Sequence, residues 1–261
     1  MTSGSLVSVY NIFTHEAWHC QGNPAGVIFS ESEPPAPLMQ SLAAQHQLPA
    51  ISFLWPAAKN GHYHVRWYAP DMEIQLCGHG AMAIFAWLYE EKQQKKATLH
   101  FPFGEINGGW QASNKVYQET AVIPVTQSLP IDNLLQDGLG INIAEHYATA
   151  NKNIVITSSE RELREMKPDF ALLRKLPYFG YSVTAPSSIV DFVSRTIIPK
   201  TKQLEDHATG SSHAALAPYW QPILKKKKLL ALQLSPRGGF FECELTKKDQ
   251  VILKGNYTQT N

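Results

Sequence analysis

The sequence has few cysteines, little net charge and no long apolar run, and each shortage argues against a class of protein. Its three cysteines, Cys20, Cys77 and Cys243, are widely spaced and form no CxxC pair, so neither a disulfide framework nor a structural zinc site is expected. The formal net charge of +1 does not favour binding to nucleic acid or to an anionic membrane. No apolar run approaches the roughly 18 residues of a membrane span, and residues 1–5 lack the features of a secretory signal. We therefore expect a cytoplasmic protein with no nucleic-acid or membrane partner.

The composition is that of a chain with a packed core. Hydrophobic residues make up 44% and aromatic residues 10% of the 261 positions, which is enough for one or two globular domains. Strand-like and helix-like patterns are mixed without strict alternation of strand and helix. This mixture predicts an α+β architecture rather than a doubly wound sheet.

Two segments, 77–83 and 209–215, resemble each other. Both are small and polar, and both lead into an apolar helix, predicted over 80–90 and 213–220, that carries a tryptophan. This similarity indicates two related halves. We place them at 1–118, with the helix start at Cys77-Gly78-His79, and at 119–261, with the helix start between Asp206 and Ser211.

Each glycine-containing turn exposes backbone N–H groups at the positive end of a helix, where a carboxylate or phosphate can bind. If the halves face each other, the two helix starts converge on one cleft that suits a small anionic ligand. The candidate binding residues are Gly78, Gly210, Ser211 and Ser212. The alternative, which stays open, is that the glycines only form tight turns.

Two side chains at these turns suit proton transfer, namely the carboxylate of Asp206 and the imidazole of His79. Cys77 is either activated by the helix dipole or simply a small buried residue. His213 either contacts ligand or packs. The histidines show no metal-ligand spacing and no dinucleotide fingerprint is present, so we expect neither a metal nor an organic cofactor.

Five motifs in order closely resemble the phenazine-biosynthesis isomerase-like (PhzF-like) family. They are GNPAGV at 22–27, WYAP at 67–70 followed by Glu73, LCGHG at 76–80, EDHATGSSHAAL at 205–216 and SPRGG at 235–239. The resemblance runs from about residue 9 to residue 255, nearly the whole chain.

The resemblance implies a diaminopimelate-epimerase-like fold, with two pseudo-symmetric domains that each wrap a mixed, barrel-like sheet around a central helix. It also implies cofactor-independent acid/base isomerisation of a small carboxylic acid in the cleft between them, and a homodimer. Position by position, His79 and Asp206 match catalytic residues, and Gly78 and Ser211 match residues that contact substrate.

One departure from the family concerns catalysis directly. The family's acid/base glutamate lies in a motif resembling N-L-S-E-T-x-F-V, and the matching stretch 47–54 has Ala50 in its place. Alanine cannot transfer a proton. His207 replaces a proline beside Asp206 and either compensates or is neutral. Two hypotheses follow: a divergent isomerase or epimerase that uses Asp206 and His79, or a relative that binds a small anion without turnover.

Overall fold

The computed structural model describes residues 7–246 and 249–260 of the chain. The chain folds into two compact units. Unit 1 comprises residues 1–120 and 254–261, and unit 2 comprises residues 121–253. The chain therefore returns to unit 1 at its C-terminal end, through the strand β17 (Gln250–Thr260).

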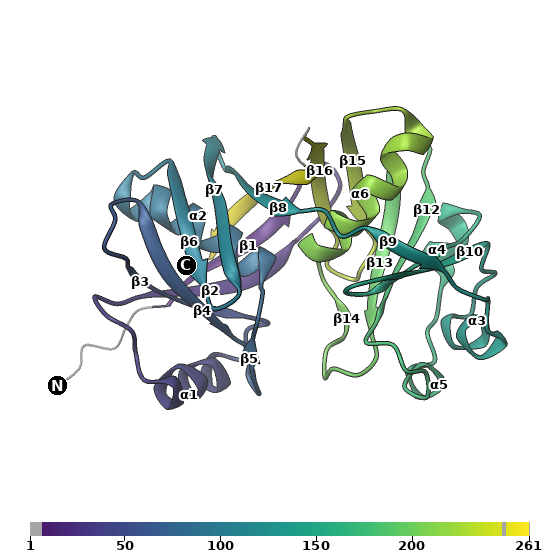
Figure 1. The fold of residues 1–261 in the computed structure, drawn as a ribbon, viewed down its shortest axis with the longest axis horizontal. Coiled ribbons are helices and arrows are strands. Elements are labelled where there is room, and N and C mark those ends of the chain that lie inside the picture. The colour runs from purple at the N-terminus through teal and green to yellow at the C-terminus, as the bar shows by residue number, and fades with distance from the viewer. Residues whose placement is uncertain (1–6, 247–248, 261) are drawn as a thin grey trace. The chain divides into compact units, whose positions relative to one another are not determined.

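Strands of unit 1 pair in a closed ring. Its order is β1 (Ser8–Thr14), β2 (Asn23–Phe29), β3 (Ile51–Pro56), β4 (His62–Tyr68), β6 (Lys96–Phe101), β7 (Gly104–Ala112), β8 (Lys115–Ala121) and β17, which pairs with β1. The pairs β2–β3 and β4–β6 are parallel, so the sheet is mixed. The first and last strands, purple and yellow in Figure 1, are neighbours in this ring. The short β5 (Glu73–Ile74) pairs with β4.

The helix α2 (Gly78–Lys92) is the core element of unit 1 (Figure 1). Every residue from Gly80 to Leu88 is buried, and the helix contacts β1, β2, β3, β6 and β7. A helix that is apolar all round is stable only when it is surrounded, and the ring of strands satisfies that requirement. The shorter α1 (Ala36–His46) packs through Met39 and Ala43 on residues of β2, β3 and β4.

Unit 2 also combines a mixed sheet with a buried helix. Its strands pair in the order β9 (Val125–Ser128), β10 (Glu145–Thr149), β11 (Asn153–Ile156), β12 (Tyr181–Pro186), β13 (Phe192–Ile198), β15 (Lys228–Gln233) and β16 (Gly239–Leu245), and β14 (Leu204–Asp206) pairs with β13. The buried helix α6 (Gly210–Leu224) contacts β12 and β16. Three short helices complete the unit, α3 (Asn133–Leu139), α4 (Glu160–Glu165) and α5 (Phe170–Leu173). The predicted α+β class, with barrel-like mixed sheets and central helices, is confirmed.

The central helices α2 and α6 correspond residue by residue. Both have 15 residues, and their N-cap residues, Cys77 and Thr209, are 132 positions apart and have similar extended conformations. The helices end 132 positions apart as well, each with a left-handed C-cap residue, Gln93 and Lys225. Each helix begins two or three residues before its predicted start, because glycine and serine are weak helix formers and hide the first turn in the sequence. Within the described residues, no helix is long and apolar enough to cross a membrane.

Candidate functional site

The start of α6 offers unsatisfied backbone donors. Thr209 occupies the N-cap position but makes no side-chain cap, because its hydroxyl donates a hydrogen bond to Asp206 Oδ2 instead (2.7 Å). The first N–H groups of a helix have no intrahelical acceptor. Without a side-chain cap they remain available to an anion, which the helix dipole also attracts.

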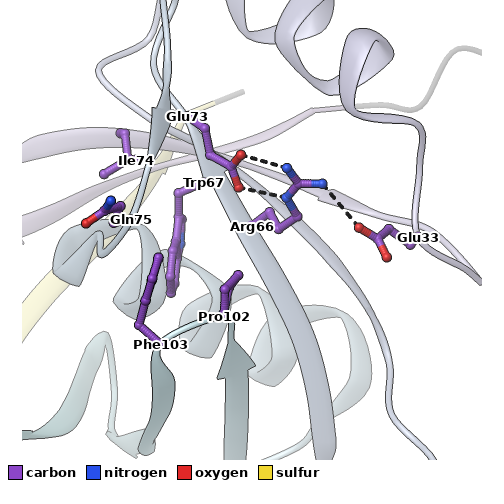
Figure 2. Close-up of a pocket in the computed structure, with 8 residues that line it drawn as sticks. All are labelled: Glu33, Arg66, Trp67, Glu73, Ile74, Gln75, Pro102 and Phe103. Carbon is purple, nitrogen blue, oxygen red and sulfur yellow. Dashed lines mark hydrogen bonds and ion pairs between the residues drawn. The ribbon is translucent and has the colours of Figure 1, made fainter.

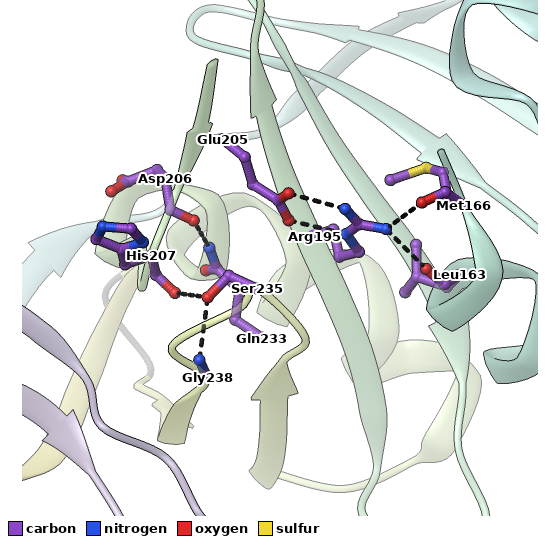
Figure 3. A network of polar contacts seen from close by, with 9 residues as sticks. All are labelled: Leu163, Met166, Arg195, Glu205, Asp206, His207, Gln233, Ser235 and Gly238. Carbon is purple, nitrogen blue, oxygen red and sulfur yellow. Dashed lines mark hydrogen bonds and ion pairs between the residues drawn. The ribbon is translucent and has the colours of Figure 1, made fainter. Parts of the chain in front are cut away.

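Asp206 is held beside this helix start by its neighbours in unit 2. Gln233 donates from Nε2 to the Asp206 carbonyl oxygen (2.7 Å) and accepts from the Thr209 N–H (2.9 Å). Figure 3 shows the first of these contacts, together with Ser235, whose hydroxyl donates to the His207 carbonyl oxygen (2.5 Å). The buried Gln233 amide thus fixes the loop that carries the carboxylate.

A bidentate ion pair anchors β14, the strand that ends at Asp206. Arg195 on β13 donates from Nε and Nη2 to the two carboxylate oxygens of Glu205, both at 2.8 Å. Its Nη1 donates to the carbonyl oxygens of Leu163 and Met166 (Figure 3). Nearly every donor of this buried guanidinium is therefore used, which is the arrangement that makes a buried charge tolerable.

Lys152 is a member of the site that the sequence did not reveal. It lies in the turn between β10 and β11 and is only 5% exposed. Its ammonium group donates to Ser211 Oγ (2.9 Å) and to Asn151 Oδ1. Burial lowers the pKa of Lys152 to about 8, and the nearby Asp206 carboxylate acts in the opposite direction. In the sequence it is one polar residue among others in the stretch Asn151-Lys152-Asn153, with no signal of burial.

Three residues in the first turn of α6, Ser211, Ser212 and His213, have different environments. Ser211 contacts Lys152, whereas the Ser212 hydroxyl lies in a buried network with Ser182 and Thr196 (both 2.9 Å). His213 is fully buried and stacks on Phe241 (ring centroids 3.5 Å apart), and its Nδ1 lies 2.9 Å from the Thr209 carbonyl oxygen. Burial lowers the pKa of His213 to about 4. Of the two roles left open for His213, this geometry favours packing.

His207, beside Asp206, is half-buried. Burial lowers the pKa of its imidazole, while Asp206 acts to raise it. Its Nδ1 has no hydrogen-bond partner among the described residues. Such an imidazole is neutral near pH 7 and can accept a proton.

In unit 1, the corresponding helix start is formed by Cys77, Gly78 and His79. Cys77 is buried, and its Sγ lies 3.6 Å from His79 Nδ1. Its side chain makes no cap on α2, so this turn too leaves backbone N–H groups to other partners. A Cβ on Gly78 would lie 3.0 Å from Gln118 Nε2, and one on Gly80 would lie 2.8 Å from the Trp67 ring. Glycine is therefore needed for close packing at Gly80.

Ala50, at the position of the family's glutamate, is fully buried. Its carbonyl oxygen accepts a hydrogen bond from the Gly26 N–H (2.9 Å). Asn153 and Gly180 make the same contact in unit 2 (3.0 Å), so Ala50 belongs to a backbone arrangement common to both units. In this structure the position holds only a methyl group.

A separate pocket of about 440 Å³ lies in unit 1, among β4, β5 and the turn after β6 (Figure 2). The Arg66 guanidinium makes a bidentate pair with Glu73 (2.7 and 2.6 Å) and also contacts Glu33 (3.2 Å). The pair Arg66–Glu73 is the unit 1 counterpart of Arg195–Glu205. No predicted site residue lines this pocket, whose other members are Trp67, Ile74, Gln75, Pro102 and Phe103.

The predicted site residues therefore fall into two groups, Asp206 to His213 in unit 2 and Ala50 with Cys77 to His79 in unit 1. That both groups face one cleft stays a prediction. Among the described residues, no group of three or more His, Cys, Asp or Glu side chains is placed to hold a metal ion, and the expected lack of a metal or cofactor also stays a prediction.

Comparison with known proteins identifies the fold first and then the family. The fold is shared with a probable proline racemase from Agrobacterium radiobacter, which has 10% identity and a TM-score of 0.62, with 98% of this chain and 92% of the other covered. It is also shared with a predicted epimerase from Pseudomonas aeruginosa, which has 14% identity and a TM-score of 0.77, with 98% of both chains covered. A sequence model of the family described as "Phenazine biosynthesis-like protein" (PhzC-PhzF) matches residues 10–259. The chain belongs to this family, as its motifs predicted.

Closer relatives agree along nearly the whole chain. A crystal structure of a phenazine biosynthesis protein of the PhzF family from Enterococcus faecalis has 32% identity and a TM-score of 0.87, with 98% of both chains covered. A putative PhzC/PhzF protein from Clostridium difficile has 32% identity and a TM-score of 0.86, with 97% of both chains covered. An uncharacterized isomerase from Pseudomonas aeruginosa is 34% identical over 90% of this chain and 89% of its own length.

Proposed function

We propose that this protein isomerises or epimerises a small carboxylic acid by acid/base proton transfer without a cofactor, with Asp206 and His79 as the proton-transferring groups. Family membership and the name isomerase given to a relative that is 34% identical support an isomerase reaction. The carboxylate of Asp206 and the imidazole of His79 support the acid/base chemistry.

The observation that carries the proposal is the arrangement around Asp206. Its carboxylate accepts a hydrogen bond from Thr209 (2.7 Å) at the open start of a buried helix, in the same part of unit 2 as a buried lysine. A carboxylate so placed can take a proton from a substrate carbon, while the helix start stabilises the negative charge that develops on the substrate. His79 lies in the first turn of α2, the equivalent helix of unit 1, and is the candidate for the second proton transfer.

A second candidate function is binding of a small carboxylic acid without turnover. The observation that favours it is Ala50, a fully buried alanine where the family has its acid/base glutamate. A general acid or base typically contributes about 10²- to 10⁴-fold in rate, so its loss separates binding from catalysis unless another group takes over. Asp206, His79 and His207 are the candidates for that role.

Proton exchange with the solvent distinguishes the two functions. The protein would be incubated in deuterated water with small 2-amino, 2-hydroxy and unsaturated carboxylic acids, including a dihydro-hydroxyanthranilate, and deuterium incorporation followed by NMR. We expect incorporation into one compound class, slowed about 10²- to 10⁴-fold in Asp206→Asn. Asp137→Asn, which changes an exposed carboxylate of the same unit, is the control and should match the wild type.

Equal incorporation by the wild type and Asp206→Asn would contradict the role of Asp206. No incorporation into any of the acids, with binding of carboxylates retained, would contradict turnover and support the second candidate.

A further inference from the structure

A buried ammonium group with only neutral hydrogen-bond partners lies at the start of α6. Lys152 Nζ donates to the Ser211 hydroxyl and the Asn151 amide oxygen. The nearby Asp206 carboxylate acts on this ammonium group electrostatically, and neither hydrogen-bond partner carries a charge. An ammonium group has three N–H donors, so one of them has no acceptor in the described part of the chain.

Burying a charge is costly unless an opposite charge or a full set of hydrogen bonds compensates for it. At Lys152 the compensation within the protein is incomplete. The cost is tolerable if the site normally takes an anion.

Other donors at the same place point to the same kind of ligand. Ser211 Oγ accepts from Lys152, which leaves its own hydroxyl hydrogen to donate. The first turn of α6 has no side-chain cap, because Thr209 is engaged with Asp206. An ammonium N–H, a hydroxyl and backbone N–H groups thus gather at one helix start, and all of them are donors.

Among the described residues, a buried lysine ammonium group contacts the helix start of unit 2 and not the one of unit 1. By the matching contacts of Gly26 with Ala50 and of Asn153 with Gly180, the residue of unit 1 that corresponds to Lys152 is Ala25, a fully buried apolar residue. The two helix starts are therefore chemically different, and only the start of α6 has a lysine ammonium group hydrogen-bonded to its first turn, among the residues that the structure describes.

We propose that Lys152, with the Ser211 hydroxyl and the uncapped first turn of α6, binds the carboxylate group of the ligand. This deepens the proposed function, on which it rests in taking the ligand to be a carboxylic acid. Lys152 holds the anionic end of the ligand and leaves proton transfer to Asp206.

The binding is coupled to protonation. Burial lowers the pKa of Lys152 to about 8, so about half of the lysine is neutral at pH 8. An anion that binds the ammonium form raises this pKa, and the protein then takes up a proton from the solvent. Up to about half a proton is taken up per ligand near pH 8. Affinity therefore falls as the pH rises through this region.

Isothermal titration calorimetry with benzoate tests the proposal, with benzamide as the uncharged analogue of the same shape. Titrations at about pH 8 in two buffers with different enthalpies of protonation give the number of protons taken up. We expect the wild type to bind benzoate with proton uptake and benzamide far more weakly. Lys152→Met should bind benzoate roughly tenfold to a hundredfold more weakly and without uptake.

Two further variants sharpen the result. Lys152→Arg keeps the charge but cannot release its proton, so it should keep more of the affinity and lose the uptake. Lys175→Met removes an exposed lysine of unit 2 and should behave as the wild type. Wild-type affinity and uptake in Lys152→Met, or equal binding of benzoate and benzamide by the wild type, would overturn the proposal.

If Lys152→Met does not fold, NMR of lysine Cε–Hε groups in the wild type gives the same answer. One lysine should titrate near pH 8 and shift to a higher pKa when benzoate is added, and its absence from the Lys152→Arg spectrum assigns it. No such lysine, or no shift, would overturn the proposal.

Benzoate binding through Lys152 without deuterium incorporation would sustain this inference while contradicting turnover. Turnover with benzoate binding unchanged in Lys152→Met would contradict this inference alone.

Discussion

The two corresponding Arg–Glu pairs provide an internal comparison of a buried ion pair with an exposed one. The Arg195 and Glu205 side chains are 11% and 13% exposed, whereas those of Arg66 and Glu73 are 22% and 38% exposed. Both pairs are bidentate and tie a short strand to its neighbour. The perturbation is the same in each unit, Arg195→Met or Arg66→Met.

The expected costs differ because of solvent. Arg195→Met leaves the Glu205 carboxylate buried without its partner and also removes the donors to two carbonyl oxygens, and breaking a buried pair typically costs about 3–5 kcal/mol. The Glu73 carboxylate can regain water when Arg66 is removed, so Arg66→Met should cost about 1 kcal/mol or less. Because both variants delete a guanidinium group, the prediction is that the loss of stability in Arg195→Met is several times the loss in Arg66→Met.

Hydrogen exchange followed by mass spectrometry measures each unit separately. In Arg195→Met, peptides from β13 and β14 should lose protection from exchange by the larger of the two expected costs. In Arg66→Met, peptides from β4 and β5 should lose protection by the smaller one. Glu205→Gln, which keeps the shape of the carboxylate and removes its charge, should recover part of the loss in Arg195→Met. Equal losses in the two units would refute the reasoning that burial decides the cost.

Further predictions follow from individual side chains. Burial lowers the pKa of His213 from 6.5 to about 4, so only the unfolded chain is protonated between these values. Acid should then lower the free energy of unfolding by up to about 3 kcal/mol, measured by urea titrations, and this dependence should be smaller in His213→Gln. Between about pH 8 and 10.5 Lys152 carries its proton in the unfolded chain but not in the folded protein. The free energy of unfolding of the wild type, relative to that of Lys152→Met, should therefore rise with pH. A difference between the two proteins that does not change with pH would contradict the burial of the lysine. A Cβ on Gly108 would lie 2.4 Å from the Phe85 ring, so Gly108→Ala should cost about 1–3 kcal/mol in thermal unfolding. Ala50→Glu places a carboxyl in a fully buried position and should lower the melting temperature and restore little deuterium incorporation.

The sequence was sufficient for the features that depend on local chemistry. The polar, glycine-containing turns before apolar helices mark the starts of α2 and α6 to within three residues. The family motifs cover both turns and the Asp206 loop, and they predict the fold. The strand β7 shows the limit, because Gly108 and Gly109 are unusual in strands. They are required there by close packing on Phe85 and on the Lys95 backbone, which depends on the closed ring.

The candidate site was predictable only in part for the same reason. Asp206, Ser211 and the glycines lie in contiguous motifs, so their proximity is local. Lys152 is 59 residues from Ser211 in the sequence and reaches it through the pairing of β11 with β12 and the packing of α6. No pattern around Lys152 distinguishes it from a solvated turn residue. The packing of His213 likewise depends on Phe241 from a distant strand.

The central claim is that a carboxylic acid binds at the start of α6, beside Asp206. A crystal structure of the protein with benzoate tests it most directly. We expect the carboxylate oxygens within about 3 Å of Lys152 Nζ, Ser211 Oγ and the first N–H groups of α6. Benzoate bound instead on Arg66 in the unit 1 pocket, with no contact to Lys152 or Ser211, would contradict the account.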